Sequence, residues 1–151
     1  MTNILFATDR QAEHLEQARA LCGVKAFHAD AVALAVYQDQ GSKRELIAIA
    51  VFHGDRAGNA DMEIGIPDGQ KLSLAAAKGL AAAAFHPKYL NKRALEAWVK
   101  AEDRDTQVVL LQAGFSFAAV VPRLFDGQFF TAVMTLGRGT FEVMEAANAA
   151  D

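Results

Sequence analysis

Residues 61–85 read DMEIGIPDGQKLSLAAAKGLAAAAF, and this stretch decides the fold of the chain. Its first six positions alternate between apolar residues and polar or small ones, with Met62, Ile64 and Ile66 on the apolar side. That alternation is the period-2 pattern of a strand with one buried face. Pro67 and Gly69 then end the strand and turn the chain. A strand followed by a tight loop is therefore predicted over residues 61–70.

The loop leads directly into a helix. Ser73 suits the N-cap position, because its hydroxyl can accept a hydrogen bond from an otherwise unpaired N–H of the first turn. The alanine-rich run that follows predicts a helix to about Phe85, ended by Pro87. Backbone N–H groups and the helix dipole attract anions to such a helix start. The stretch carries neither a Walker-type phosphate loop nor the dinucleotide glycine fingerprint, so an ordinary connection and an anion site both remain open.

The composition indicates one globular domain. The chain has 151 residues, 52% of them hydrophobic and 22% charged, which is enough for a proper core. Its formal charge of −3 disfavours general nucleic-acid binding. Cys22 is the only cysteine, which excludes an intramolecular disulfide and a cysteine-rich zinc site. The sequence has no leader-like pattern at its start and no apolar run of membrane-spanning length, so a cytoplasmic protein without membrane contact is expected.

Periodicity and turn residues define the remaining elements. Strands are predicted at 3–7, 31–38, 45–53, 61–66, 93–100, 115–121 and 128–136, the last two joined by an Asp-Gly hairpin turn. Helices are predicted at 10–22 with Asp9 as cap, at 73–85, at 104–112 with Asp103 as cap, and in the tail with Thr140 as cap. This order predicts a single α/β domain over residues 1–151, with a mixed, mostly antiparallel sheet and helices on both faces. The strands at 61–66 and 93–100 form its parallel pair.

The loop also carries a family resemblance. The spacing from Pro67 to Gln70, Ser73 and Ala75 resembles motif A of the GNAT superfamily of acyl-CoA N-acyltransferases, with Ser73 in place of the first glycine. The resemblance implies that backbone N–H groups of this loop hold the pyrophosphate of coenzyme A. The implied cofactor-binding residues of the loop are Gln70, Lys71, Leu72, Ser73, Leu74 and Ala75.

A second segment strengthens the resemblance. Residues 97–115, AWVKAEDRDTQVVLLQAGF, resemble the strand and short helix of the GNAT branch that acetylates ribosomal-protein N-termini. Asp103 stands at the Asn position, Thr106 at the Ser/Ala position, and Gly114-Phe115 at the closing Gly-Phe. The resemblance implies that Asp103 and Thr106 line the pantetheine or adenine part of the cofactor. Leu110 stands where many GNAT enzymes have a tyrosine acid.

The resemblance also implies where the chemistry lies. GNAT folds splay the two parallel strands apart, so that strand N–H groups near Ile64 to Ile66 would meet the acyl carbonyl. Glu63 on the same strand is the first candidate for the base that deprotonates the amine, and a paired or solvated glutamate is the alternative. His53, which ends the preceding predicted strand, is the second candidate, with an exposed loop-end histidine as its alternative. Trp98 is expected in the core or in a pocket wall.

Three functions are compatible with these features. The first is an acetyl-CoA-dependent N-acetyltransferase acting on a primary amine of a protein or small molecule. The second is a catalytically degenerate GNAT-fold protein that binds and modulates a partner protein, of the kind that occurs in phage genomes and acts on host proteins; the off-pattern Ser73, Asp103 and Leu110 favour it. The third, a base-modifying relative acting on DNA, is disfavoured by the net charge. A homodimer is compatible with either of the first two, and no spacing predicts a metal site.

Overall fold

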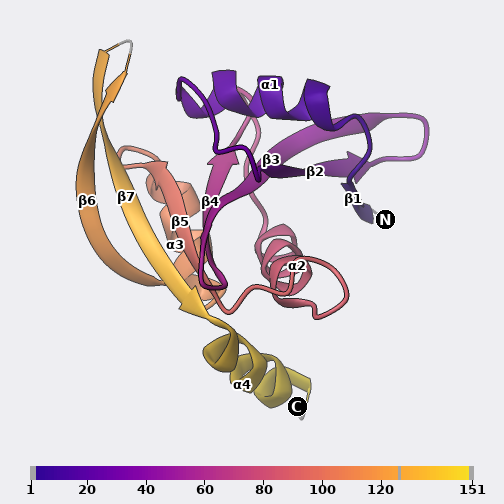
Figure 1. The fold of residues 1–151 in the computed structure, drawn as a ribbon. Helices are drawn as coiled ribbons and strands as arrows, with labels where there is room; N and C mark the ends of the chain where they lie inside the picture. Colours follow the sequence, from indigo (N-terminus) through magenta and orange to yellow (C-terminus); the bar gives the residue numbers. More distant parts are fainter. Residues whose placement is uncertain (1–2, 126, 150–151) are drawn as a thin grey trace.

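The computed structural model describes residues 3–125 and 127–149 (Figure 1). The strands there are β1 (Asn3–Ala7), β2 (Val32–Asp39), β3 (Arg44–Arg56), β4 (Asn59–Gly65), β5 (Ala94–Lys100), β6 (Ser116–Phe125) and β7 (Gly127–Gly137). The helices are α1 (Gln11–Cys22), α2 (Leu74–Phe85), α3 (Arg104–Gln112) and α4 (Arg138–Ala149). In this part of the chain, none of the helices has the length and apolar character needed to cross a bilayer.

The strands form one seven-stranded mixed sheet in the order β1-β2-β3-β4-β5-β7-β6. Every neighbouring pair is antiparallel except β4 and β5, which are parallel and joined through α2. A parallel pair needs such a crossover connection, whereas hairpins join the antiparallel neighbours. The predicted mixed sheet with one parallel pair is confirmed.

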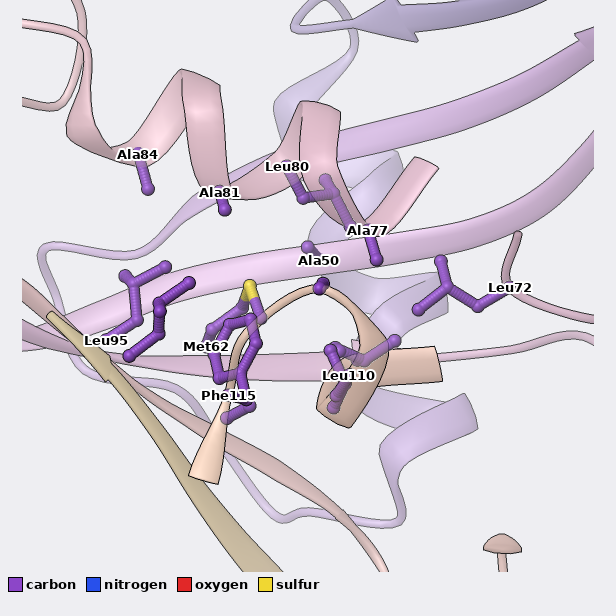
Figure 2. Close-up of a cluster of buried hydrophobic side chains, with 14 of the residues drawn as sticks. Ala50, Met62, Leu72, Ala77, Leu80, Ala81, Ala84, Leu95, Leu110 and Phe115 are labelled. Carbon is purple, nitrogen blue, oxygen red and sulfur yellow. The ribbon is translucent and has the colours of Figure 1, made fainter. Parts of the chain in front are cut away.

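The main core lies between the sheet and the helices α2 and α3 (Figure 2). Four alanines of α2 face the sheet and are at most 1% exposed, namely Ala76, Ala77, Ala81 and Ala84. Their small side chains let the helix lie close to Met62 and Leu95 on the parallel strands. The alanine-rich sequence therefore serves packing here as well as helix propensity.

Helix α1 covers the other face of the sheet over β2, β3 and β4 (Figure 1). A smaller apolar cluster fills this contact, and it includes Ala18, Ala33 and Ile49. At Gly65 the end of α1 comes so close that an added Cβ would lie 2.8 Å from the Cβ of Leu21. The strands β2 and β3 are buried on both faces, as their two-sided apolar pattern predicts.

Two predicted helix caps are wrong. Arg10, in the left-handed region with φ of 50°, precedes α1 in place of Asp9. The start of α1 is instead held by Gln11, whose side-chain amide exchanges two hydrogen bonds with the backbone of Ala33. The tail helix begins at Arg138, two residues before the predicted cap Thr140.

The strand β3 also extends three residues beyond its predicted end at His53. The carboxylate of Asp30 accepts hydrogen bonds from the N–H groups of Gly54 and Asp55, which satisfies the backbone where the register shifts. His53 therefore lies inside the sheet and is only 6% exposed. The expectation of an exposed loop-end histidine is wrong.

Candidate active site

The parallel strands β4 and β5 stop pairing before either strand ends. Their register runs from Asn59 opposite Ala94 to Glu63 opposite Trp98, while β4 continues to Gly65 and β5 to Lys100. A cavity of about 70 Å³ lies at this divergence. It is lined by Leu21, Cys22, Glu63, Ile64, Ile66, Trp98, Val99, Lys100, Asp103, Arg123 and Thr131. Because whole-ligand pockets measure about 300–1,000 Å³, this cavity accommodates only a small part of a ligand.

Four adjacent strands each place at least one polar side chain on the α1 face at this cavity. Glu63 of β4 lies opposite Trp98 of β5. Thr131 of β7 lies opposite Lys100, two residues beyond Trp98 and so on the same face. Arg123 of β6 is two residues beyond Val121, the partner of Thr131. These residues are far apart in sequence and meet only because the strand order is β4-β5-β7-β6.

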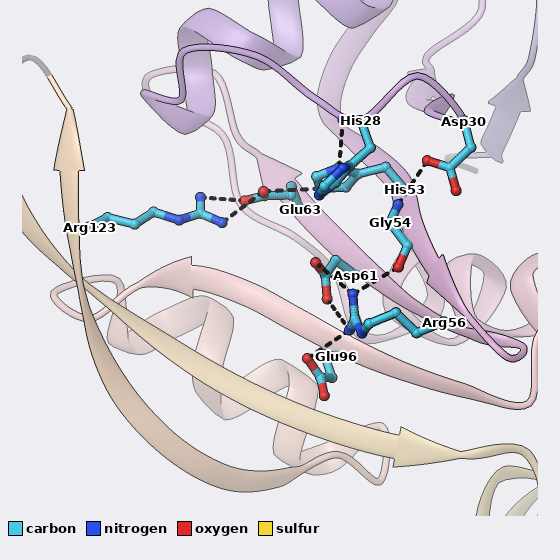
Figure 3. Close-up of polar contacts among 9 residues, drawn as sticks. All are labelled: His28, Asp30, His53, Gly54, Arg56, Asp61, Glu63, Glu96 and Arg123. Atoms are coloured by element: carbon cyan, nitrogen blue, oxygen red, sulfur yellow. Dashed lines mark hydrogen bonds and ion pairs between the residues drawn. The ribbon is translucent and has the colours of Figure 1, made fainter.

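Glu63 and Arg123 form a buried, two-pronged ion pair (Figure 3). The guanidinium Nη1 donates to Oε1 at 2.6 Å and Nη2 donates to Oε2 at 2.8 Å. The side chain of Glu63 is 4% exposed and that of Arg123 is 17% exposed. The guanidinium also stacks on Trp98, with its central carbon 4.6 Å from the ring centroid. Arg123 thereby links the edge hairpin, formed by β6 and β7, to β4 across the face of β5.

His53 completes this network from β3. Its Nδ1 accepts a hydrogen bond from the backbone N–H of His28 at 3.1 Å. The ring proton therefore sits on Nε2, which donates to Oε2 of Glu63 at 3.1 Å. Both ring nitrogens are engaged, so His53 fixes the orientation of the Glu63 carboxylate.

The pKa of Glu63 reflects opposing causes. Burial by itself raises the pKa of this carboxyl, but the hydrogen bonds from His53 and Arg123 and the positive charge of Arg123 outweigh it. The net result is a pKa below the ordinary range, so Glu63 is ionised at neutral pH. For the Cys22 thiol at the same cavity, burial raises the pKa to about 12, so it is not a nucleophile at neutral pH.

Two buried polar atoms at the cavity have no hydrogen-bond partner within the described part of the chain. They are the indole Nε1 of Trp98 and the hydroxyl Oγ1 of Thr131. Buried polar groups in proteins are nearly always hydrogen-bonded, so such exceptions need an explanation. Both atoms belong to side chains that line the same cavity.

A second polar cluster lies on the same sheet face, toward the paired ends of the strands (Figure 3). Arg56 donates to Asp61 at 2.9 Å and to Glu96 at 3.2 Å. This cluster is more open to solvent, with 52% of the Arg56 side chain and 40% of the Glu96 side chain exposed. It does not line the cavity.

The predicted phosphate loop lies between β4 and α2. The hydroxyl of Ser73 caps α2 by accepting from the N–H of Ala76 at 3.1 Å, which confirms the predicted cap. Leu72 packs in the main core and is 4% exposed, so its side chain is not available to a ligand. Lys71 forms an exposed ion pair with Asp105 of α3 at 3.6 Å. The first N–H groups of α2, those of Leu74 and Ala75, have no partner within the helix.

The other predicted cofactor residues lie at the start of α3. One carboxylate oxygen of Asp103 accepts from the N–H of Thr106 at 3.1 Å and the other from its hydroxyl at 2.6 Å. Asp103 is therefore the helix cap that the sequence predicts, and it also lines the cavity. Thr106 is buried beneath it.

The structure thus brings Glu63, Ile64, Ile66 and Asp103 to one cavity, with His53 behind Glu63. Gln70 to Ser73 lie in the adjacent loop and Leu74 and Ala75 in the first turn of α2, and none of these six residues lines the cavity. Sequence reasoning missed Arg123 and Thr131 as site residues. The signal available was a single arginine within the apolar run AAVVPRLF, but the strand order that brings it to Glu63 could not be read from that run. Within the described residues, no group of three or more His, Cys, Asp or Glu side chains could hold a metal ion.

The fold of this chain is similar to that of several solved N-acetyltransferases. A mutant form of the spermidine/spermine N-acetyltransferase SpeG from Vibrio cholerae superposes with a TM-score of 0.66 at 11% identity, over 94% of this chain and 98% of that chain. A dodecameric spermidine N-acetyltransferase from Vibrio cholerae gives 0.63 at 12% identity, over 91% and 95%. A chimera of SpeG and hSSAT gives 0.60 at 17% identity, over 76% and 70%.

The chain therefore has the GNAT fold that its sequence resemblance implies. Neither a protein-family model nor the sequence of a curated protein matches it. The resemblance to the ribosomal-protein branch stays a prediction.

Proposed function

We propose that this protein is an acetyl-CoA-dependent N-acetyltransferase that acts on a primary amine of a protein or small molecule. The divergence of β4 from β5 beyond the Glu63–Trp98 pair carries this proposal. Ile64 and Gly65 still pair with β3, so only N–H groups on the β5 side are released there. Such N–H groups, fixed beside a small cavity, are suited to polarise a carbonyl oxygen. The likeness in fold to N-acetyltransferases supports the same function.

The loop before α2 is the proposed cofactor site. Backbone N–H groups from Lys71 to Ala75 would hold the pyrophosphate, aided by the helix dipole, whereas the N–H of Gln70 donates to the carbonyl of Pro67 at 3.0 Å. Ser73 uses its hydroxyl to satisfy one donor of the first turn, which leaves those of Leu74 and Ala75 for a ligand. Bound acetyl-CoA would supply a thioester: the amine nitrogen would form a bond to its carbonyl carbon, the C–S bond would break, and the sulfur would leave with the electron pair as a thiolate that takes a proton from solvent.

Glu63 is the proposed acceptor of the amine proton, directly or through a water molecule. A carboxylate offers about four acceptor positions, and Arg123 and His53 fill three of them, which leaves one on Oε1. Its lowered pKa makes it a weak base, so its main contribution is to attract and orient the ammonium. His53 is the proposed positioning residue that keeps Oε2 occupied.

Coenzyme A binding tests the cofactor site. Calorimetric titration with coenzyme A should show binding, and Ser73→Asp should abolish it because a carboxylate would face the bound anion. Ser73→Gly should tighten binding if the serine side chain crowds the pyrophosphate, whereas Ser73→Ala, which also loses the capping hydroxyl but keeps the Cβ, should not. Absence of binding by the wild-type protein would contradict the proposal.

The rate of acetyl transfer tests the proposed role of Glu63. Glu63→Gln should leave coenzyme A binding unchanged and reduce acetyl transfer by roughly 10²-fold, the lower part of the usual range for a positioned base. Glu96→Gln is the matched control, because it makes the same change in the exposed cluster outside the cavity. Equal turnover by both variants would remove Glu63 from the mechanism.

One observation favours the partner-binding function instead. Phe117, Val120 and Phe130 lie on one face of the β6–β7 hairpin and are 54%, 51% and 60% exposed. Clustered exposed apolar side chains are a feature of protein-binding surfaces. That function would be supported if the wild-type protein neither binds coenzyme A nor transfers acetyl, and if a partner protein that binds the wild type does not bind Phe117→Ser.

A further inference from the structure

The unpartnered groups at the cavity specify the acceptor more closely than the fold does. We infer that the acceptor amine of the proposed acetyltransferase carries a carboxylate, as an amino acid does, and that Trp98 and Thr131 bind this carboxylate. The inference rests on the proposed function for the identity of the amine. It rests on the side chains of β5 and β7 for the carboxylate.

The first step concerns the two unpartnered atoms. The indole N–H of Trp98 can only donate a hydrogen bond, and the hydroxyl of Thr131 can donate one. Thr131 is 2% exposed, and neither atom has a partner within the described residues. The two side chains are diagonal neighbours on one sheet face, a spacing that an indole ring can bridge. A ligand oxygen placed in the cavity is the partner that both donors lack.

The second step concerns charge. The cavity is lined by two carboxylates and two cations. Glu63 is engaged by Arg123 and His53, and Asp103 has both of its oxygens on Thr106. The ammonium of Lys100, in contrast, has no carboxylate partner within the described residues. The four formal charges cancel, because the neutral Thr106 does not neutralise Asp103; the exposed ammonium of Lys100 can nevertheless pair with an anionic ligand group.

The third step compares possible acceptors. A protonated polyamine has no hydrogen-bond acceptor, so it would leave the donors of Trp98 and Thr131 unsatisfied. An amino acid brings two carboxylate oxygens for the donors, and its ammonium can take the remaining acceptor position on Oε1 of Glu63. The cavity of about 70 Å³ is much smaller than a pocket for a whole ligand, so it fits a small part of the substrate and not a long chain.

The fluorescence of Trp98 provides a direct test, because Trp98 is the only tryptophan of the chain. Titration with the standard amino acids should change its emission for at least one of them, with and without coenzyme A. The corresponding amines that lack the carboxylate, such as ethylamine for alanine, should bind at least about tenfold more weakly. Spermidine should not compete. Equal binding of the decarboxylated amines or of spermidine would overturn the inference.

Thr131→Val separates ligand binding from folding. This variant removes an unpartnered buried hydroxyl at nearly constant shape, so its melting temperature should equal or exceed that of the wild type. Its affinity for the amino acid should nevertheless fall by about 10- to 100-fold. Thr135→Val is the matched control, since Thr135 lies on the same strand and face but does not line the cavity, and its affinity should be that of the wild type. Unchanged affinity in Thr131→Val would overturn the inference.

Trp98→Phe removes the second donor while keeping a ring under Arg123, and calorimetry should show a similar loss of affinity. A fluorescence change of wild-type Trp98 with acetyl-CoA, sensitive to Thr131→Val and without any response to amino acids, would assign these donors to the thioester carbonyl and overturn the inference. Acetyl transfer to spermidine but not to amino acids would overturn it and leave the proposed function standing. Amino-acid binding without coenzyme A binding would overturn the proposed function and leave the carboxylate site of Trp98 and Thr131 standing.

Discussion

Two carboxylate–arginine clusters lie on the same face of the parallel strands, and they differ in burial (Figure 3). Asp61 and Glu96, opposite each other where the strands pair, share the exposed Arg56. Glu63 lies two residues along β4, where pairing ends, and binds Arg123 with side-chain exposures of only 4% and 17%. Similar ion pairs thus lie in two environments within one strand.

The difference in burial indicates in which cluster the loss of one charged partner should lower the free energy of unfolding most. Exposed ion pairs contribute about 0–1 kcal/mol, because water solvates the separated charges almost as well. A buried pair gives no large net gain over apolar side chains of similar volume, yet removing one partner strands a charge away from water. A protein that retains such a pair beside a cavity keeps a feature that stability alone does not require. This is why the buried cluster, and not the exposed one, is the candidate site.

Arg123→Met is expected to have the largest effect. It leaves the Glu63 carboxylate buried with only His53 as a side-chain partner, so the free energy of unfolding should fall by about 3–5 kcal/mol. Urea denaturation at neutral pH measures this loss. Arg56→Met is the control and should cost no more than about 1 kcal/mol. Equal losses in the two variants would show that burial does not distinguish the clusters.

The double variant Glu63→Met with Arg123→Met sharpens the same comparison. It removes both charges and supplies apolar side chains, so it should recover most of the stability lost by Arg123→Met. A double variant as unstable as the single one would mean that packing against Trp98, and not the stranded charge, accounts for the loss.

The pH dependence of stability should come next in size. Because the pKa of Glu63 is lower in the folded than in the unfolded protein, its ionisation stabilises the fold above the unfolded pKa. An unfolded glutamate takes up its proton at about pH 4. The stability from Glu63 is therefore lost as the pH falls below about 4 and passes through the pKa of the folded protein. Glu63→Gln should flatten this part of the stability curve measured by urea denaturation at successive pH values. A curve parallel to that of the wild type would contradict the lowered pKa.

Glu96→Gln should have the smallest effect, about 0–1 kcal/mol at low ionic strength. At about 1 M salt, where screening acts over about 3 Å, the difference from the wild type should vanish in the same urea assay. The deficit of Arg123→Met should persist in that salt, because buried charges are screened much less. If the loss of unfolding free energy in Glu96→Gln did not change with salt, this cluster would behave like the buried one.

Much of the fold was determined by local sequence. Alternation in residues 61–66, the turn residues Pro67 and Gly69, and the caps Ser73 and Asp103 gave the strand, loop and helices at nearly their observed bounds. These signals are local, because a strand's buried face and a cap's hydrogen bond depend on residues within a few positions. The parallel pair followed from the helix between its strands.

The candidate site was only half determined by sequence. Glu63 and His53 could be named from their strands, but their contact with each other depends on the register of β3 against β4 and on the extension of β3 to Arg56. Arg123 and Thr131 come from a hairpin and lie sixty or more positions beyond Glu63 in the chain.

Only the tertiary structure decided that the edge hairpin lies beside β5 and reaches across Trp98 to β4. Sheet order and strand divergence are set by packing among all the strands, so no local pattern encodes them. The physical environment of Glu63 followed from the same packing: burial raised its cost as a charge, and Arg123 and His53 offset that cost. The sequence supplied a carboxylate on a strand, and the fold made it a buried ion pair at a cavity.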